Sequence, residues 1–332
     1  MVASFTGLNI AVAGTGSIGK RHISEIEKLT SRVNWTFVRE NKTHDQFSLE
    51  KQASLVSSVR QALITKPHFL IISNPSFLHA EIIQQALQAS IPFYVEKPVA
   101  INHEQISALS NAIKVFHPLP CTQVGCNLRF LPSIRRFKEV IDEGLIGHIA
   151  RASFEVGQWL PDWRPATNYI DSYSANPDQG GGVLLDLIHE IDIARWIFGT
   201  MKPISCIKSY VPSLEILSES VASATLTTPN NAIVNINLDY IARKPVRRYQ
   251  VVGDKGTIVW DLSLKELTLQ TVTNRYVLSC GPNDFDILGT YRTAWTTFLD
   301  SLCNDLVCVQ PLTEGLETSA LAIQLKEMAC QI

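Results

Sequence analysis

Short apolar runs alternate with amphipathic segments over the first third of the chain. Runs of four to eight apolar residues predict buried strands, whereas apolar positions that recur every three to four residues predict helices. Strands with mainly apolar residues are predicted at 8–13, 34–38, 68–73 and 92–95, and helical segments at 20–29, 79–89 and 104–114. Strands that alternate with helices form a doubly wound parallel sheet. We therefore expect an α/β domain over residues 1–122.

After Gly147 the spacing of apolar residues changes to a period of two. This alternation predicts strands with one buried face, and it recurs at 149–156, 220–227, 232–240, 248–252 and 257–260. Residues 123–332 should therefore form an α+β domain with a large, mostly antiparallel open sheet. We expect the other face of this sheet to expose apolar residues and to be covered by another copy of the chain, in a homodimer or homotetramer.

A glycine pattern, Gly14-Thr-Gly16-Ser-Ile-Gly19, separates the first predicted strand from the first helix. The first glycine of such a motif permits a tight turn, the second lets the backbone approach a pyrophosphate, and the third lets helix and strand pack closely. The helix N-terminus then directs unpaired N–H groups at the phosphates. In this context the motif predicts a Rossmann-type dinucleotide site formed by Gly14, Gly16, Ser17, Ile18 and Gly19.

Arg39 and Glu40 end the second predicted strand, 20 and 21 residues beyond Gly19. At this spacing a carboxylate accepts hydrogen bonds from the ribose hydroxyls of NAD, whereas an arginine binds the 2′-phosphate of NADP. The sequence therefore fits both NAD and NADP. We favour NAD, because repulsion of the 2′-phosphate of NADP by Glu40 is harder to offset than a missing attraction between a cofactor and Arg39.

Ligands of a doubly wound sheet bind beyond the carboxyl ends of its strands. Asn74 and Pro75 follow one predicted strand, and Glu96-Lys97-Pro98 follows the next. Because a residue before proline is kept out of the helical region, Lys97 should lie on a fixed loop. Its ammonium is suited to hydrogen-bond a substrate hydroxyl. The candidate cofactor-binding residues of this region are Asn74, Pro75, His79, Glu96 and Lys97.

Residues 180–199 begin with three glycines and continue as one predicted helix, which carries Asp186 and His189. Side chains three residues apart share a helix face. An imidazole exchanges protons near neutral pH, whereas a lysine ammonium needs burial or nearby cations to lose its proton. We therefore assign proton transfer to His189, orientation of the substrate oxygen to Lys97, and support of either group to Asp186.

The segment 158–173 is too long and too aromatic for a plain linker. Aromatic rings, an arginine and hydroxyl groups suit the binding of a sugar, so Trp163, Arg164 and Tyr173 are candidates for a substrate-binding wall. The alternative is an ordered loop that its tryptophans anchor on the core. The basic run at 243–248 suits either the phosphates of a nucleotide sugar or a solvated strand end, and the second reading is favoured.

Composition limits the remaining classes of function. The net charge of -2 provides no broad attraction for nucleic acid or an anionic membrane. The seven cysteines are scattered without a metal-binding spacing, so we expect reduced thiols and no metal site. No stretch of 18 apolar residues and no secretory leader pattern occurs in this sequence, and we expect a cytoplasmic protein.

Five segments resemble the glucose-fructose oxidoreductase and inositol dehydrogenase family, often written Gfo/Idh/MocA, and they follow its order. They are AVAGTGSIGKRH at 11–22, SNPSFLHAEIIQQAL at 73–87, YVEKPVA at 94–100, VGCNLRFLPSIRRFKEVIDEGLIGHI at 124–149 and GGGVLLDLIHEIDIARWIFG at 180–199. The resemblance implies an NAD(P)-dependent dehydrogenase or reductase of sugars, polyols or sugar derivatives, nucleotide sugars included. It also implies a Rossmann domain followed by an α/β domain on a large open sheet.

The resemblance further implies roles for single residues. Lys97 of the EKP motif is the catalytic or substrate-positioning lysine, His189 lies near the reacting carbon, and Asn127 lies near the nicotinamide and the substrate. Many members place an aspartate four residues before the histidine, whereas Asp186 precedes His189 by three. This displacement motivates a rival hypothesis, a cofactor-binding regulator or scaffold without turnover.

Overall fold

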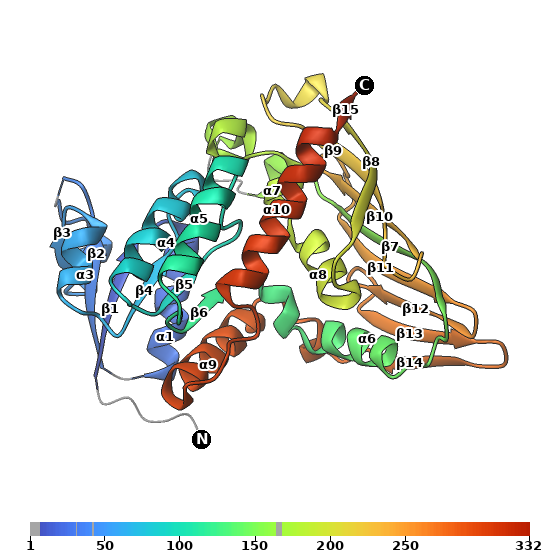
Figure 1. Ribbon diagram of the computed structural model, residues 1–332, viewed down its shortest axis with the longest axis horizontal. Helices are drawn as coiled ribbons and strands as arrows, with labels where there is room; N and C mark the ends of the chain where they lie inside the picture. Colours follow the sequence, from blue (N-terminus) through green and yellow to red (C-terminus); the bar gives the residue numbers. More distant parts are fainter. Residues whose placement is uncertain (1–6, 31, 42, 164–167) are drawn as a thin grey trace. The chain divides into compact units, whose positions relative to one another are not determined.

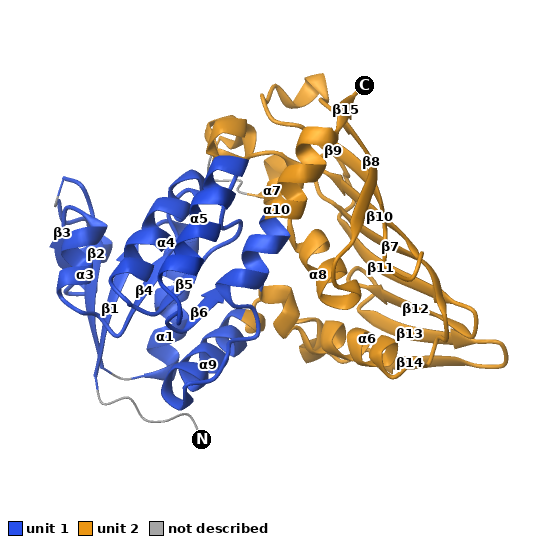
Figure 2. Ribbon diagram, in the orientation of Figure 1, with its two compact units in different colours: residues 1–126, 291–319 blue, residues 127–290, 320–332 orange. Residues whose placement is uncertain are grey.

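The computed structural model describes residues 7–30, 32–41, 43–163 and 168–332 (Figure 1). The chain divides into two compact units, which Figure 2 colours separately. The first holds residues 1–126 and 291–319, and the second holds residues 127–290 and 320–332. The predicted domain boundary between residues 122 and 123 stays a prediction, because compactness alone does not show which part folds independently.

The first unit contains the expected parallel sheet. Its strand order is β3-β2-β1-β4-β5-β6, and every neighbouring pair is parallel. Its strands are β1 (Leu8–Ala13), β2 (Val33–Val38), β3 (Ser54–Val56), β4 (Phe69–Ile72), β5 (Phe93–Val95) and β6 (Thr122–Val124). All residues of β4 and β5 are buried, as a parallel sheet covered on both faces requires.

Helices connect and cover these strands. They are α1 (Ser17–Leu29), α2 (Gln46–Glu50), α3 (Val59–Ile64), α4 (His79–Gln88), α5 (His103–Val115), most of α9 (Gly289–Asn304) and the first half of α10 (Leu312–Met328). Trp295 and Phe298 of α9 are fully buried against Phe69 and Tyr94 of the sheet. No helix in the described part of the chain is both long enough and apolar enough to cross a membrane.

The second unit is built on the predicted open sheet, in the order β14-β13-β12-β11-β7-β10-β9-β8-β15. Only the pairs β7–β10 and β8–β15 are parallel. The strands are β7 (Ile149–Gly157), β8 (Lys202–Ser209), β9 (Val221–Thr227), β10 (Ile233–Asp239), β11 (Val246–Gly253), β12 (Gly256–Asp261), β13 (Glu266–Thr271), β14 (Arg275–Ser279) and β15 (Cys330–Gln331).

The two faces of this sheet differ in polarity. One face carries buried side chains such as Phe154 and is contacted by α6 (Pro132–Asp142) and α8 (His189–Phe198). On the other face Ser223 donates a hydrogen bond to Asn237, and Thr225 donates one to Asn235. The expectation of a broad apolar outer face is therefore wrong for these central strands, since the alternate positions are filled by polar residues. The homodimer or homotetramer stays a prediction.

The predicted single helix at 180–199 is also wrong. It is divided into α7 (Val183–Asp186) and α8, which begins at His189. Leu187 separates them with φ -92° and ψ 34°, outside the helical region. Asp186 therefore ends one helix and His189 begins the next, so spacing on a single helix face does not describe this pair.

Candidate functional site

The three glycines of the first βα turn have distinct steric surroundings. Gly14 has φ 99°, and a Cβ there would collide with the backbone of Ser73 and Asn74. A Cβ on Gly19 would collide with the Gly14 carbonyl oxygen, so helix and strand meet closely at this point. By contrast, nothing lies within 4 Å of a Cβ on Gly16. This open space at the helix start is what a bound pyrophosphate needs.

Ser17 and Ile18 are the first two residues of α1, after the N-cap Gly16. Because Gly16 has no side chain, no side-chain hydrogen bond caps this helix. The backbone N–H groups of its first turn are the donors that a helix leaves for an anion.

The residues after β2 meet the glycine turn. Arg39 donates hydrogen bonds to Thr15 Oγ1 at 3.0 Å and to Asp45 Oδ2 at 2.8 Å. The hydrogen bond from Arg39, with a further one from the Ser48 backbone, holds the pKa of Asp45 well below its ordinary value. The adjacent Glu40 is exposed. The sequence had not indicated Asp45 or Thr15, because only the direction of the Arg39 side chain brings them together.

A groove of about 1470 Å³ begins beside this turn. Its lining includes Gly14, Glu40 and Asn74 at the carboxyl ends of β1, β2 and β4, and it continues between α3 and α4. Among the described residues, Asn74 Oδ1 is a buried side-chain oxygen without a hydrogen-bond partner. A buried acceptor beside a groove is suited to a ligand that brings a donor.

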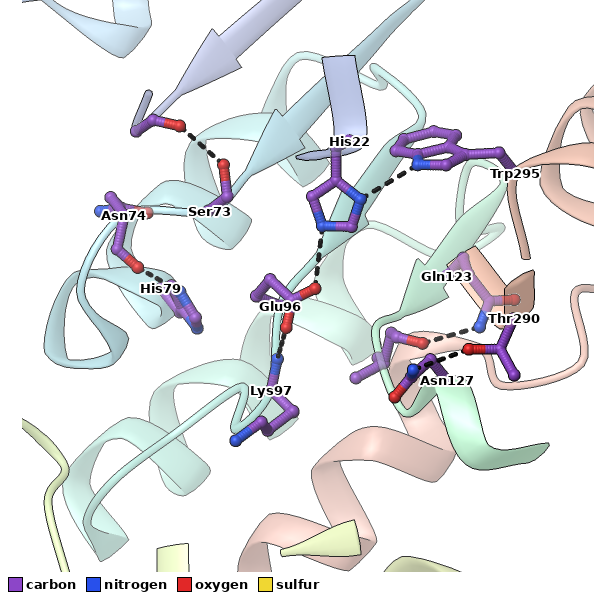
Figure 3. Close-up of polar contacts among 12 residues, drawn as sticks. His22, Ser73, Asn74, His79, Glu96, Lys97, Gln123, Asn127, Thr290 and Trp295 are labelled. Atoms are coloured by element: carbon purple, nitrogen blue, oxygen red, sulfur yellow. Dashed lines mark hydrogen bonds and ion pairs between the residues drawn. The ribbon is translucent and has the colours of Figure 1, made fainter. Parts of the chain in front are cut away.

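A buried network holds the loop that carries Lys97 (Figure 3). Trp295 Nε1 donates to His22 Nδ1 at 3.0 Å, which leaves the His22 proton on Nε2, 2.8 Å from Glu96 Oε1. The Lys97 backbone N–H donates to the other Glu96 oxygen at 3.4 Å. Burial acts to raise the pKa of Glu96, but the hydrogen bond from His22 and the charge of Lys97 bring it below its ordinary value.

His79 joins the loop after β4 to the loop after β5. Its Nδ1 lies 2.7 Å from the Pro98 carbonyl oxygen and its Nε2 lies 2.9 Å from the Asn74 carbonyl oxygen. Burial lowers the pKa of His79, although both carbonyls favour the protonated form. Neither His22 nor His79 faces solvent, so they position the loops. Pro75, in the loop after β4, is exposed.

In the second unit, Asn127 and His189 lie on elements that a buried ion pair connects. Asn127 begins the 3-10 helix η2 (Asn127–Phe130) and donates from Nδ2 to Thr290 Oγ1 at 2.8 Å. Arg129 of η2 makes two hydrogen bonds, of 2.9 and 2.8 Å, to the carboxylate of Asp192 in α8. Two parallel bonds fix orientation as well as distance, so this clamp orients the start of α8, where His189 is half-buried.

Asp186 is the acceptor of a hydroxyl cluster. It receives hydrogen bonds from Tyr173 Oη at 2.6 Å, Ser174 Oγ at 2.7 Å and Tyr240 Oη at 3.2 Å. Its exposed fraction is 3%. The three hydroxyl donors offset the free-energy cost of burying this carboxylate. The most direct effect of Asp186 is to orient Tyr173.

The aromatic segment is anchored within the second unit. The half-buried Trp163 ends the 3-10 helix η3 (Leu160–Trp163) and packs edge-on against Tyr240, with ring centroids 5.4 Å apart. This contact agrees with an anchoring role for that tryptophan. Arg164, the predicted sugar-binding arginine, lies outside the described residues.

The three arginines of the basic run at 243–248 have local partners. Arg243 lies over the ring of Trp159 at 3.5 Å, and Arg247 Nε lies 2.8 Å from Glu190 Oε1. Arg248 Nε lies 3.8 Å from Asp261. These contacts favour a paired strand end over a site for phosphates.

Two family models match the chain. One, described as oxidoreductase family, NAD-binding Rossmann fold, matches residues 8–116, and the GFO/IDH/MocA C-terminal domain matches residues 134–259. Together they span more than two thirds of the chain. Both models describe parts of the same family.

Relatives and solved structures agree with these matches. An uncharacterised oxidoreductase of Bacillus subtilis is 26% identical over 298 residues, which are 86% of this chain and 82% of that protein. Levoglucosan dehydrogenase of Pseudarthrobacter phenanthrenivorans is 29% identical over 234 residues, 64% of this chain and 56% of that protein. The solved structure of a levoglucosan dehydrogenase in complex with NADH has a TM-score of 0.84 at 20% identity and covers 98% of this chain and 97% of its own. That likeness shows the fold.

Proposed function

Since the chain belongs to the Gfo/Idh/MocA family of oxidoreductases, with the family's NAD-binding Rossmann domain at its N-terminal side, we propose that it oxidises or reduces a sugar, polyol or sugar derivative at a hydroxyl-bearing carbon. The observation that carries the proposal is the open glycine turn on the same parallel sheet as the rigidly held Lys97 loop. The name of the levoglucosan dehydrogenase relative supports the sugar class.

The residues of the first unit fit a nicotinamide dinucleotide. The space at Gly16, the uncapped start of α1 and the unpartnered Asn74 Oδ1 provide a pyrophosphate cradle and a further acceptor. When bound, the nicotinamide accepts or donates the hydride. We assign contacts with the cofactor to Gly14, Gly16, Ser17, Ile18, Gly19, Arg39, Glu40, Asn74, Pro75, His79, Glu96, Lys97 and Asn127.

We assign transfer of the hydroxyl proton of the substrate to His189, because an imidazole exchanges protons near working pH. Lys97 hydrogen-bonds and polarises the substrate oxygen from a loop that Glu96 and His22 hold in place. Asp186 acts as a positioning residue through Tyr173, whose hydroxyl it binds. Asn127, Trp163, Arg164 and Tyr173 are assigned to substrate binding.

The cofactor proposed is NAD. Arg39 is the cation at the ribose end of the turn, and it already binds Thr15 and the Asp45 carboxylate. A 2′-phosphate would therefore meet Asp45 and Glu40 as well as Arg39. Repulsion from two carboxylates outweighs the attraction of one shared guanidinium.

The test is turnover of a panel of sugars, inositols and nucleotide sugars, followed at the nicotinamide absorbance. Once a substrate is found, His189→Ala should lower kcat by about 10²- to 10⁴-fold, while NAD affinity measured by calorimetry stays within about twofold. His148→Ala, at an exposed histidine of the same unit, is the matched control and should leave kcat unchanged.

Two outcomes would count against the proposal. Unchanged kcat in His189→Ala would remove this histidine from proton transfer. Tight NAD binding without turnover of any compound in the panel would support the regulator or scaffold instead.

A further inference from the structure

Two thiols meet in the first unit, among residues to which no cofactor or substrate role is assigned. Cys121 directly precedes β6, and Cys308 lies between α9 and α10. Their Sγ atoms are 3.4 Å apart, although the two residues are 187 positions apart in the sequence. Both are free thiols.

The segments that carry the two thiols are hydrogen-bonded to each other. Val124 N donates to the Gln310 carbonyl oxygen at 2.9 Å, and Leu312 N donates to Thr122 Oγ1 at 3.0 Å. These bonds keep the two sulfurs close. A disulfide bond is about 2.0 Å long, so closing it needs a movement of roughly 1.4 Å from the observed separation.

The two sulfurs differ in acidity. A hydrogen bond from Cys121, together with one from Ser301, lowers the pKa of Cys308, whereas the same contact and burial raise the pKa of Cys121. Cys308 is thus the sulfur that carries the negative charge first. It is 6% exposed, and the half-buried Cys121 beside it connects the pair to solvent. A thiolate next to a second thiol is the arrangement of a redox-sensitive pair.

We propose that Cys121 and Cys308 form a redox-active dithiol that closes to a disulfide when the protein meets a small peroxide. The Cys308 thiolate attacks hydrogen peroxide, the O–O bond breaks, and a sulfenic acid forms while the released hydroxide takes a proton to become water. Cys121 then loses its proton and attacks that sulfur, which releases the second water. Two thiols and one peroxide give one disulfide and two waters. The new bond ties β6 to the segment that precedes α10.

The test removes the exposed thiols first. In the variant Cys280→Ser/Cys303→Ser/Cys330→Ser, which replaces the three exposed cysteines, four thiols remain. After treatment of the folded protein with one equivalent of hydrogen peroxide, thiol titration under denaturing conditions should find two. Dithiothreitol should restore four, and peptide mapping should recover Cys121 linked to Cys308. The melting temperature of the oxidised form should be higher, because a long loop is closed.

Two further variants identify which cysteines form the disulfide. Adding Cys121→Ser should abolish the linkage and leave a Cys308 sulfenic acid that dimedone traps. Adding Cys206→Ser, at a buried cysteine of the second unit, should keep the linkage. Four remaining thiols after peroxide, or a linkage between another pair, would overturn the proposal. None of these measurements needs enzymatic activity, so their failure leaves the proposed function untouched.

Discussion

The Arg39 guanidinium donates to two side-chain acceptors, Thr15 and Asp45, and this sharing bears on cofactor choice. Asp45 caps α2 as well as binding Arg39. Asparagine caps a helix about as well as aspartate does, so the charge of Asp45 can be removed while its structural role is kept. The pair therefore permits a clean test of cofactor preference.

Asp45→Asn should raise NADP affinity by about tenfold, the equivalent of about 1.4 kcal/mol, because Arg39 becomes available to a 2′-phosphate. NAD affinity should change little. Calorimetric titration with both cofactors measures the effect. Glu40→Gln is the matched control, since it removes an adjacent carboxylate that does not bind Arg39. A larger gain of NADP affinity in the control than in Asp45→Asn would assign the preference to Glu40.

His79 predicts a pH dependence of stability. Its pKa in the folded protein is lowered by burial, so the unfolded chain binds a proton at a higher pH than the folded chain does. This contribution to stability is complete above the ordinary imidazole pKa of about 6.5 and is lost as pH falls through the lower folded value. Denaturant unfolding between pH 8 and 5 should show a steeper loss in the wild type than in His79→Gln. Equal slopes would contradict the prediction, and the exposed His148→Gln should behave as the wild type.

At the scale of elements, the turn between β1 and α1 contains one glycine that the packing of the protein requires, Gly19, and one that the proposed ligand requires, Gly16. A Cβ on Gly19 meets the Gly14 carbonyl, whereas a Cβ on Gly16 meets nothing. The two glycines therefore have different reasons to lack a side chain.

Gly16→Ala should keep the melting temperature of the wild type and lose more than about tenfold in NAD affinity, because the methyl group fills the space of the pyrophosphate. Gly19→Ala should lose both stability, by about 1–3 kcal/mol for a forced contact, and NAD affinity. Thermal unfolding and calorimetry measure the two quantities. Wild-type NAD affinity in Gly16→Ala would place the pyrophosphate elsewhere.

At the scale of the whole molecule, the first unit depends on residues from near the end of the chain. Trp295 and Phe298 of α9 fill its core beside Phe69 and Tyr94. Burial of each such side chain contributes about 1.5–3 kcal/mol, and total stabilities are about 5–15 kcal/mol. Loss of α9 would therefore remove a large part of the stability of this unit.

A fragment of residues 1–122 should consequently fail to form a fixed core. We expect weak near-ultraviolet circular dichroism and strong binding of a hydrophobic dye. A chain that joins residues 1–126 to 291–319 through a flexible linker should regain both a cooperative transition and NAD binding. A cooperative, NAD-binding 1–122 fragment would show that the predicted boundary defines an independent domain.

Local sequence patterns were sufficient to predict the parallel sheet, the glycine turn and most strands of the open sheet. The physical reason is that burial, strand alternation and turn formation act over a few neighbouring residues, as in Leu8–Ala13 followed by Gly14. Family resemblance added Asn127, whereas Lys97 and His189 were already candidates from their local sequence; the roles of all three stay proposals. Short elements such as β3 escaped prediction, since three residues carry too little periodicity.

Tertiary structure alone decided which side chains meet outside regular helix or strand spacing. The Arg39–Asp45 pair, the Trp295–His22–Glu96 network and the Cys121–Cys308 contact have no signature in spacing. The break between α7 and α8 likewise arises where Asp186 is bound by Tyr173, Ser174 and Tyr240, from outside its own helix. Local propensity favours one helix there, but the hydroxyl donors that compensate a buried carboxylate exist only once the chain has folded.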